Sequence, residues 1–276
     1  MTRLVAVESV SDAAIAILSP EQGLADEMAM LQAVAEGRLS SASLIWSTHD
    51  CLVVPRLMES IAGFADARDA MARGGWPIHV RYTGGDIYPQ GPGIVNLAIA
   101  FRLERGNFDR VGRAYAALCD PIVRGMQDLG IGAQCSLIDG AFCRGSHDIA
   151  IAGQKIAGVA QRWRRAASPF ELSEAVLVHA GLLCAGDVER LSAAVNRFYR
   201  ACALDRKADP ASHTTLFGKR DATAVPRIAR LVARIAHHLD RAPTTRSVEL
   251  SAGLPYSATI AENEQPAPRQ NLSPSL

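Results

Sequence analysis

The sequence predicts an α+β protein with a mixed, largely antiparallel sheet flanked by helices. Helical and strand-like segments are interspersed along the 276 residues, and several neighbouring strand-like segments are joined by short turns, which is typical of hairpins. Hydrophobic residues make up 49% of the chain and charged residues 21%, an ordinary globular balance. Since this length approaches the limit for one hydrophobic core, we expect one domain at residues 1–241 and a polar, disordered tail at 242–276.

The amino-terminal half is expected to contain three helices and four strands. Leu24, Met28 and Leu31 recur at helical spacing, which predicts an amphipathic first helix. Pro121 is expected to bend or restart the third helix. The expected helices span residues 21–37, 64–73 and 108–129, and the expected strands 43–46, 51–54, 78–82 and 94–103.

The remaining half is expected to be rich in strands and then helical. Short apolar or alternating segments separated by Gly, Ser or charged residues predict strands at 134–138, 148–152, 156–162 and 174–183. Helical spacing of apolar residues predicts helices at 188–204 and 225–239.

Charge and cysteine usage narrow the class of protein. A formal net charge of +1 gives no electrostatic reason to expect nucleic acid or an anionic membrane as a partner. No apolar run is long enough to span a bilayer, and the first residues lack a signal-peptide pattern, so a cytoplasmic protein is expected. Six cysteines without a CxxC pair indicate free thiols rather than a disulfide or zinc framework, and no metal site is predicted from them.

The loop at residues 81–93 is the first segment that could carry chemistry. Gly84-Gly85 can orient successive N–H groups toward a phosphate or carboxylate, and Arg81 stands at the mouth of the loop. The chain has no GxxxxGK(S/T) string, so this is not a P-loop. Taken alone, the segment is equally compatible with a wide turn.

The hairpin at residues 145–161 is the second such segment. It contains Lys155, one of only three lysines among 29 basic residues, beside several Gly and Ala residues. One interpretation is a surface turn that happens to carry a lysine. The other is a mobile positive charge next to small side chains, which let an anionic ligand lie close to the backbone.

Several strings, in this order, resemble motifs of the biotin/lipoate protein ligase superfamily. They are Arg81-Tyr-Thr-Gly-Gly, Gln90-Gly-Pro-Gly, Asp148 with Gly153-Gln-Lys-Ile-Ala-Gly-Val-Ala-Gln161, and Val178-His-Ala-Gly-Leu-Leu183. Within the superfamily, the chain is most similar to the lipoate–protein ligase A branch and its octanoyltransferase relatives. The resemblance covers residues 20–200 approximately.

This resemblance implies a catalytic domain that attaches a lipoyl or octanoyl group to a lysine of a lipoyl carrier domain. The carriers would belong to 2-oxoacid dehydrogenase complexes or be the glycine-cleavage protein. Lys155 would contact the reacting carbonyl, and Asp148 would help to hold ATP and magnesium. His179 could alternatively be a satisfied structural residue. The residues expected to bind substrate are Arg81, Thr83, Gly84, Gly85, Gly158, Ala160 and His179.

Three functions remain open from the sequence. A ligase would form an acyl-adenylate from lipoate or octanoate with ATP and Mg²⁺, and the closest strings favour it. A transferase would need no cofactor and would accept the acyl group from acyl carrier protein as a thioester on Cys143. A non-catalytic acyl- or carrier-binding protein is the third, because Asp86 and Gln90 stand where ligases usually carry Gly and His.

A basic segment follows the lysine hairpin. Arg162, Arg164 and Arg165 surround Trp163. They are either a solvated strand end or a surface for the acidic face of a carrier domain, and the sequence does not distinguish the two.

Overall fold

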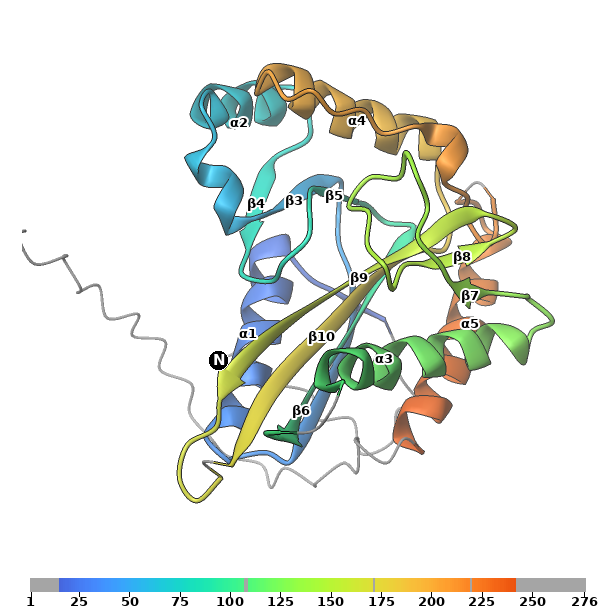
Figure 1. Ribbon diagram of the computed structural model, residues 1–276. Helices are drawn as coiled ribbons and strands as arrows, with labels where there is room; N and C mark the ends of the chain where they lie inside the picture. The colour runs from blue at the N-terminus through green and yellow to red at the C-terminus, as the bar shows by residue number, and fades with distance from the viewer. Residues whose placement is uncertain (1–14, 107–108, 171, 219, 242–276) are drawn as a thin grey trace, which may run out of the picture.

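A computed structural model describes residues 15–241, except 107, 108, 171 and 219. The predicted tail at 242–276 lies outside the described residues. Two sheets with helices packed against them confirm the α+β class (Figure 1).

The larger sheet has seven strands, and all of its neighbouring pairs are antiparallel except β1 with β2. The prediction of a mixed, largely antiparallel sheet is therefore confirmed. In spatial order the strands are β1 (Ala16–Ile17), β2 (Ser41–Ser47), β6 (Ile94–Glu104), β10 (Ser173–Leu183), β9 (Gln154–Arg165), β8 (Ile149–Ile151) and β7 (Gln134–Cys135).

The smaller sheet was not expected as a separate unit. It has the order β4 (Ile78–Arg81), β3 (Cys51–Pro55), β5 (Tyr88–Gln90), with β3 parallel to β4 and antiparallel to β5. The strands on either side of the 81–93 loop therefore lie in different sheets. β5 was not predicted because it has three residues and contains Pro89. Proline is tolerated in an edge strand, whose outer side has no hydrogen-bonded neighbour.

Helices cover the two faces of the larger sheet and one side of the smaller one (Figure 1). α1 (Pro20–Ala35) begins at Ser19, whose hydroxyl accepts a hydrogen bond from the Gln22 N–H at 3.2 Å. α3 (Arg110–Gln127) runs through Pro121 as one helix, so the expected restart does not occur. The remaining helices are α2 (Phe64–Arg73), α4 (Val188–Ala201) and α5 (Ala224–Asp240).

Alternation along the central strands decides which helix each residue meets. Ala98, Ala100 and Leu177 pack against α1, whereas the intervening residues Leu97 and Ile99 pack in the core that contains α3 and α5. Because successive side chains of a strand point to opposite faces, residues two apart share a face. His179 is two residues after Leu177 on β10 and so lies on the α1 face.

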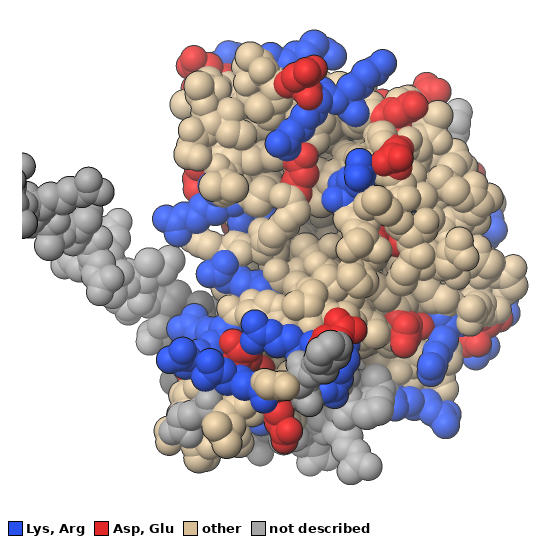
Figure 2. All heavy atoms as spheres, in the orientation of Figure 1, with Lys and Arg blue, Asp and Glu red and all other residues tan. Residues whose placement is uncertain are grey.

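None of the described helices combines the length and the apolarity needed to cross a membrane. Lys and Arg side chains gather at the lower left of Figure 2, where the outer end of β9 lies in Figure 1. Arg162, Arg164 and Arg165 are exposed on that strand end. Both interpretations of this basic segment, a solvated strand end and a surface for a carrier domain, require this exposure.

Candidate active site

A cavity opens between the α1 face of the larger sheet and the smaller sheet. Its walls combine apolar and polar side chains from segments far apart in the sequence, as expected of a ligand site. The lining includes Leu24, Glu27, Trp46, Arg81, Tyr88, Gln90, Asn96, Cys143, Gly158, Ala160, His179 and Gly181.

Small residues form the floor of this cavity. Strand pairing sets Gly158 opposite Gly181, and Ala160 opposite His179. A Cβ added at Gly158 would come within 2.8 Å of the Tyr88 ring, and one at Gly181 within 2.6 Å. Tyr88 donates its hydroxyl to the Gly181 carbonyl at 2.6 Å, and burial raises the pKa of this phenol well above its ordinary value. Glycine is therefore required at both floor positions to admit the tyrosine ring.

Arg81 folds the 81–93 loop rather than standing free at its mouth. Its guanidinium donates to the carbonyls of Gly84 at 2.9 Å, Asp86 at 2.7 Å and Val53 at 3.1 Å, and the residue is 4% exposed. Gly85 has a φ of +97°, and a Cβ there would lie 2.9 Å from the Cys143 sulfur. The loop is thus shaped so that its backbone closely approaches Cys143.

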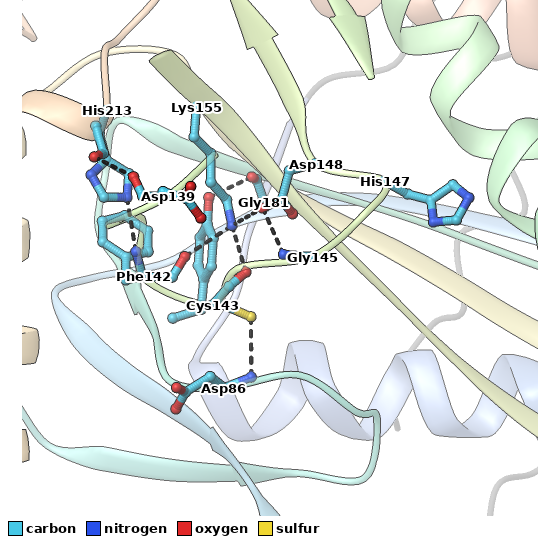
Figure 3. A network of polar contacts seen from close by, with 12 residues as sticks. Asp86, Asp139, Phe142, Cys143, Gly145, His147, Asp148, Lys155, Gly181 and His213 are labelled. Atoms are coloured by element: carbon cyan, nitrogen blue, oxygen red, sulfur yellow. Dashed lines mark hydrogen bonds and ion pairs between the residues drawn. The ribbon is translucent and has the colours of Figure 1, made fainter. Parts of the chain in front are cut away.

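Cys143 lies where the 81–93 loop meets the loop between β7 and β8. Its Sγ accepts the Asp86 backbone N–H at 3.2 Å (Figure 3). Arg81 Nη2 lies 3.6 Å from the same sulfur. The residue itself has a φ of +47°, a conformation that bulky side chains rarely adopt. The Asp86 N–H and the Arg81 guanidinium are thus directed at a sulfur that opens on the cavity.

Lys155 lies beneath the Cys143 loop and is entirely buried. Its ammonium donates to the Phe142 carbonyl at 2.9 Å and the Cys143 carbonyl at 2.6 Å, and pairs with Asp148 Oδ2 at 2.7 Å (Figure 3). All three donors of the ammonium are therefore used. Cys143 lies between the lysine and the glycine turn, because the ammonium donates to its carbonyl and a Cβ at Gly85 would lie 2.9 Å from its sulfur.

A second acid–base pair lies in the cavity wall. His179 Nδ1 is 2.7 Å from Glu27 Oε2, and His179 Nε2 is 2.9 Å from Thr83 Oγ1. Glu27 comes from α1, is 2% exposed, and accepts the Trp46 indole N–H at 3.0 Å through its other oxygen. The sequence analysis missed Glu27, although a carboxylate three residues after Leu24 on the apolar face of the first helix was a usable signal.

The chain is similar in sequence and in fold to known proteins. Residues 19–215 match the family described as the lipoyl protein ligase A/B catalytic domain. The chain belongs to this family. It is therefore an enzyme of protein lipoylation, and the resemblance deduced from the sequence motifs is confirmed.

Relatives in this family include two of similar length. An uncharacterized protein of Cupriavidus necator is 35% identical over 206 residues, which cover 72% of this chain and 81% of that protein. An octanoyl-GcvH:protein N-octanoyltransferase of Kyrpidia tusciae is 32% identical over 201 residues, covering 71% and 68%.

Solved structures agree in fold. The bipartite lipoate protein ligase of Thermoplasma acidophilum superposes with a TM-score of 0.55 at 18% identity over 82% of each chain. A lipoate-protein ligase A bound with ATP gives a TM-score of 0.51 at 16% identity, over 83% of this chain and 95% of that one. At these identities the likeness concerns the fold alone.

Asp148 was expected to hold ATP and magnesium, so its surroundings test that assignment. Its side chain is fully buried, and Oδ2 is bonded to Lys155 and to the Gly145 N–H at 2.9 Å. Burial raises the pKa of this carboxyl, and the lysine ammonium counteracts part of that rise. Asp148 is absent from the described residues that line the cavity, and the described part of the chain has no cluster of three His, Cys, Asp or Glu suited to a metal ion. In this arrangement Asp148 pairs with the buried Lys155 and does not face the cavity.

The two departures from the family loop both have polar partners within the chain. The Asp86 carboxylate accepts from Arg206 at 2.8 Å and from the Tyr199 hydroxyl at 3.2 Å, so its charge is neutralised away from the sulfur. Gln90 and Asn96 exchange two amide hydrogen bonds of 2.9 and 3.0 Å in the cavity wall.

His213 supports the Cys143 loop from a distant part of the sequence. It stacks on Phe142 with centroids 3.8 Å apart, and its Nε2 accepts the Phe142 N–H at 3.1 Å. Burial lowers the pKa of this imidazole from 6.5 to about 4, so it remains neutral. A single histidine in an irregular segment carries no sequence signal for this role.

Proposed function

We propose that this protein is a cysteine acyltransferase that moves an octanoyl or lipoyl group between lysines of two lipoyl carrier domains. The donor would be the glycine-cleavage carrier protein, and the acceptor a lipoyl domain of a 2-oxoacid dehydrogenase complex. The observation that carries this proposal is the Cys143 sulfur, which lines the cavity and has the Asp86 N–H and Arg81 directed at it.

The cavity offers what such a transfer needs. The sulfur attacks the acyl carbonyl and forms a thioester, and the acceptor lysine then takes the acyl group from it. The acyl chain would lie along the small residues Gly158, Ala160 and Gly181, beside the Tyr88 ring. Lys155 would contribute indirectly, because its ammonium fixes the Phe142 and Cys143 carbonyls and thereby the position of the sulfur.

The names of two relatives support the donor. The Kyrpidia tusciae protein and that of Bacillus velezensis are octanoyl-GcvH:protein N-octanoyltransferases, a description that names GcvH as the octanoyl donor. The buried, ion-paired state of Asp148 also favours a transferase over an ATP-dependent ligase.

The test supplies three donors in parallel. The purified full-length chain is incubated with an apo lipoyl domain and either octanoylated glycine-cleavage carrier, octanoyl acyl carrier protein, or octanoate with Mg-ATP, and all species are weighed by mass spectrometry. We expect an octanoyl adduct on Cys143 and transfer from the glycine-cleavage carrier. Cys143→Ser should abolish both, and Cys135→Ser, at an exposed thiol outside the cavity, should change neither.

Other outcomes would contradict the proposal in distinct ways. Transfer from octanoyl acyl carrier protein alone would keep the thioester but replace the donor. Modification that requires ATP and survives Cys143→Ser would indicate the ligase. No modification with any donor would indicate a non-catalytic acyl- or carrier-binding protein.

A further inference from the structure

The proposed transfer breaks one amide and forms another, so a proton must reach the leaving amine and another must leave the attacking amine. An amine is a poor leaving group until its nitrogen is protonated, and a protonated lysine is not a nucleophile. A group in the cavity must therefore exchange a proton at the reacting nitrogen. The ionisable residues among the described lining are Glu27, Arg81, Tyr88, Cys143 and His179.

Most of these groups are unsuited to that exchange. Arg81 is always protonated, and its guanidinium is bonded to backbone carbonyls. Tyr88 donates to the Gly181 carbonyl, and its raised pKa keeps the phenol protonated. Lys155, expected from the sequence to act at the carbonyl, is entirely buried and is not among the described residues that line the cavity.

We propose that His179 is the general acid and base of the transfer and that Glu27 is the residue that positions it. This inference rests on the proposed function. An imidazole accepts and donates a proton near neutral pH, and this one has a side chain that is 15% exposed in the cavity wall.

The hydrogen bonds of His179 suit both protonation states. The Glu27 carboxylate holds Nδ1 as an N–H donor, which leaves Nε2 as the atom that gains and loses a proton. Nε2 faces the Thr83 hydroxyl at 2.9 Å. Because a hydroxyl can donate or accept, Thr83 can bond Nε2 in either protonation state, and this contact is released when Nε2 exchanges its proton with the reacting nitrogen.

The reaction then balances without any further reactant. In the first half, the Cys143 thiolate attacks the amide carbonyl, the C–N bond breaks, and the proton on His179 Nε2 passes to the leaving amine. A thioester, a neutral imidazole and a free lysine result. In the second half, the neutral acceptor lysine attacks the thioester, His179 Nε2 takes its proton, and the C–S bond breaks to return the thiolate.

This assignment predicts a dependence on the leaving group. A thioester donor releases a thiolate, which needs no proton, so His179 is unnecessary for acylation from it. Hydroxylamine is largely unprotonated at neutral pH, so it should discharge the acyl-enzyme without a base. His179 is needed only where a lysine leaves or attacks.

The experiment measures four steps in the full-length wild-type and His179→Asn proteins. They are Cys143 acylation by octanoyl acyl carrier protein, acylation by octanoylated glycine-cleavage carrier, discharge to hydroxylamine, and discharge to an apo lipoyl domain. We expect about 10²- to 10⁴-fold losses in the two lysine steps and no change in the other two. His237→Asn, at an exposed histidine of α5 outside the cavity, is the matched control.

The possible results separate cleanly. Equal rate losses in all four steps would show that His179 has a structural role and would overturn the inference. Unchanged rates of the two lysine steps would also overturn it. Glu27→Gln should slow the same two lysine steps by a smaller factor, and Glu27→Asp should restore part of the lost rate. These two variants provide the test if His179→Asn folds poorly. If the wild-type protein forms no acyl-Cys143 with either donor, the proposed function fails instead.

Discussion

Two acid–base pairs support the candidate site, and they differ in whether the basic side chain reaches the cavity. Lys155–Asp148 and His179–Glu27 have the same N–O separation of 2.7 Å. The lysine is entirely buried and directs its remaining donors to two backbone carbonyls, whereas the histidine lines the cavity and bonds Thr83 Oγ1 through its second nitrogen. Proximity to a carboxylate therefore does not identify a proton-transfer group, whereas a place in the cavity wall favours His179 as one.

The contrast also separates structural from chemical contributions. A buried ion pair is seldom a large net source of stability, yet removing one partner leaves an uncompensated charge in the interior. The lysine pair holds the loop that carries the sulfur, so its loss should affect folding and activity together. The histidine pair should affect activity with little change in folding.

The largest expected effect is that of Lys155→Met. It leaves the Asp148 carboxylate buried without its cation, which should lower the free energy of unfolding by about 3–5 kcal/mol and abolish formation of acyl-Cys143. Urea unfolding and mass spectrometry measure the two quantities.

Lys155→Met combined with Asp148→Leu is the control for this variant. Removing both charges should restore most of the stability but not the activity, because the Phe142 and Cys143 carbonyls still lack their donor. Full activity in the single variant would show that the lysine does not position the sulfur.

Gly158→Ala tests the packing between the cavity floor and Lys155. The new Cβ would approach the Tyr88 ring to 2.8 Å on the cavity side and Lys155 Nζ to 3.2 Å on the other. We expect a loss of about 1–3 kcal/mol from overpacking and a preference for shorter acyl chains. Transfer of butanoyl and octanoyl groups by the two proteins measures the preference. Unchanged chain-length preference would place the acyl chain elsewhere.

The pH dependence of stability tests how His213 supports the Cys143 loop. Burial lowers the pKa of His213 from 6.5 to about 4. Its contribution to the free energy of unfolding is therefore complete above pH 6.5 and is lost as the pH falls toward 4. Between pH 7 and pH 5 the wild-type protein should lose about 2 kcal/mol more than His213→Phe, which keeps a ring against Phe142 but cannot titrate. Parallel losses in urea titrations of both proteins would contradict this.

The smallest effect is expected for Thr83→Val. Removing the hydroxyl that faces His179 Nε2 should lower the free energy of unfolding by about 1 kcal/mol, and Thr83→Ser should restore it. Transfer between lysines should fall less than in His179→Asn. A loss as large as that of His179→Asn would instead assign the proton transfer to Thr83.

Local patterns were sufficient for much of the fold. The helix at 64–73 and the strands beginning at Cys51 and Ile94 agree with the structure because helical spacing, Gly pairs and apolar runs act over a few residues. The division into two sheets was not predictable, since it depends on which distant strand pairs with β3. His213 was missed for the same reason, as its partner Phe142 lies 71 residues away in the chain. The helical position of Glu27 was readable, but its partner His179 lies 152 residues away.

The sequence by itself determined the class of fold, the family and the segments that carry the chemistry, because motif order and side-chain periodicity are properties of neighbouring residues. Only the tertiary structure decided that Lys155 is sealed beneath the loop, that Cys143 opens on the cavity and that His179 faces it in company with Glu27. The physical reason is that burial and hydrogen-bond partners arise when strands and helices from opposite parts of the chain pack together.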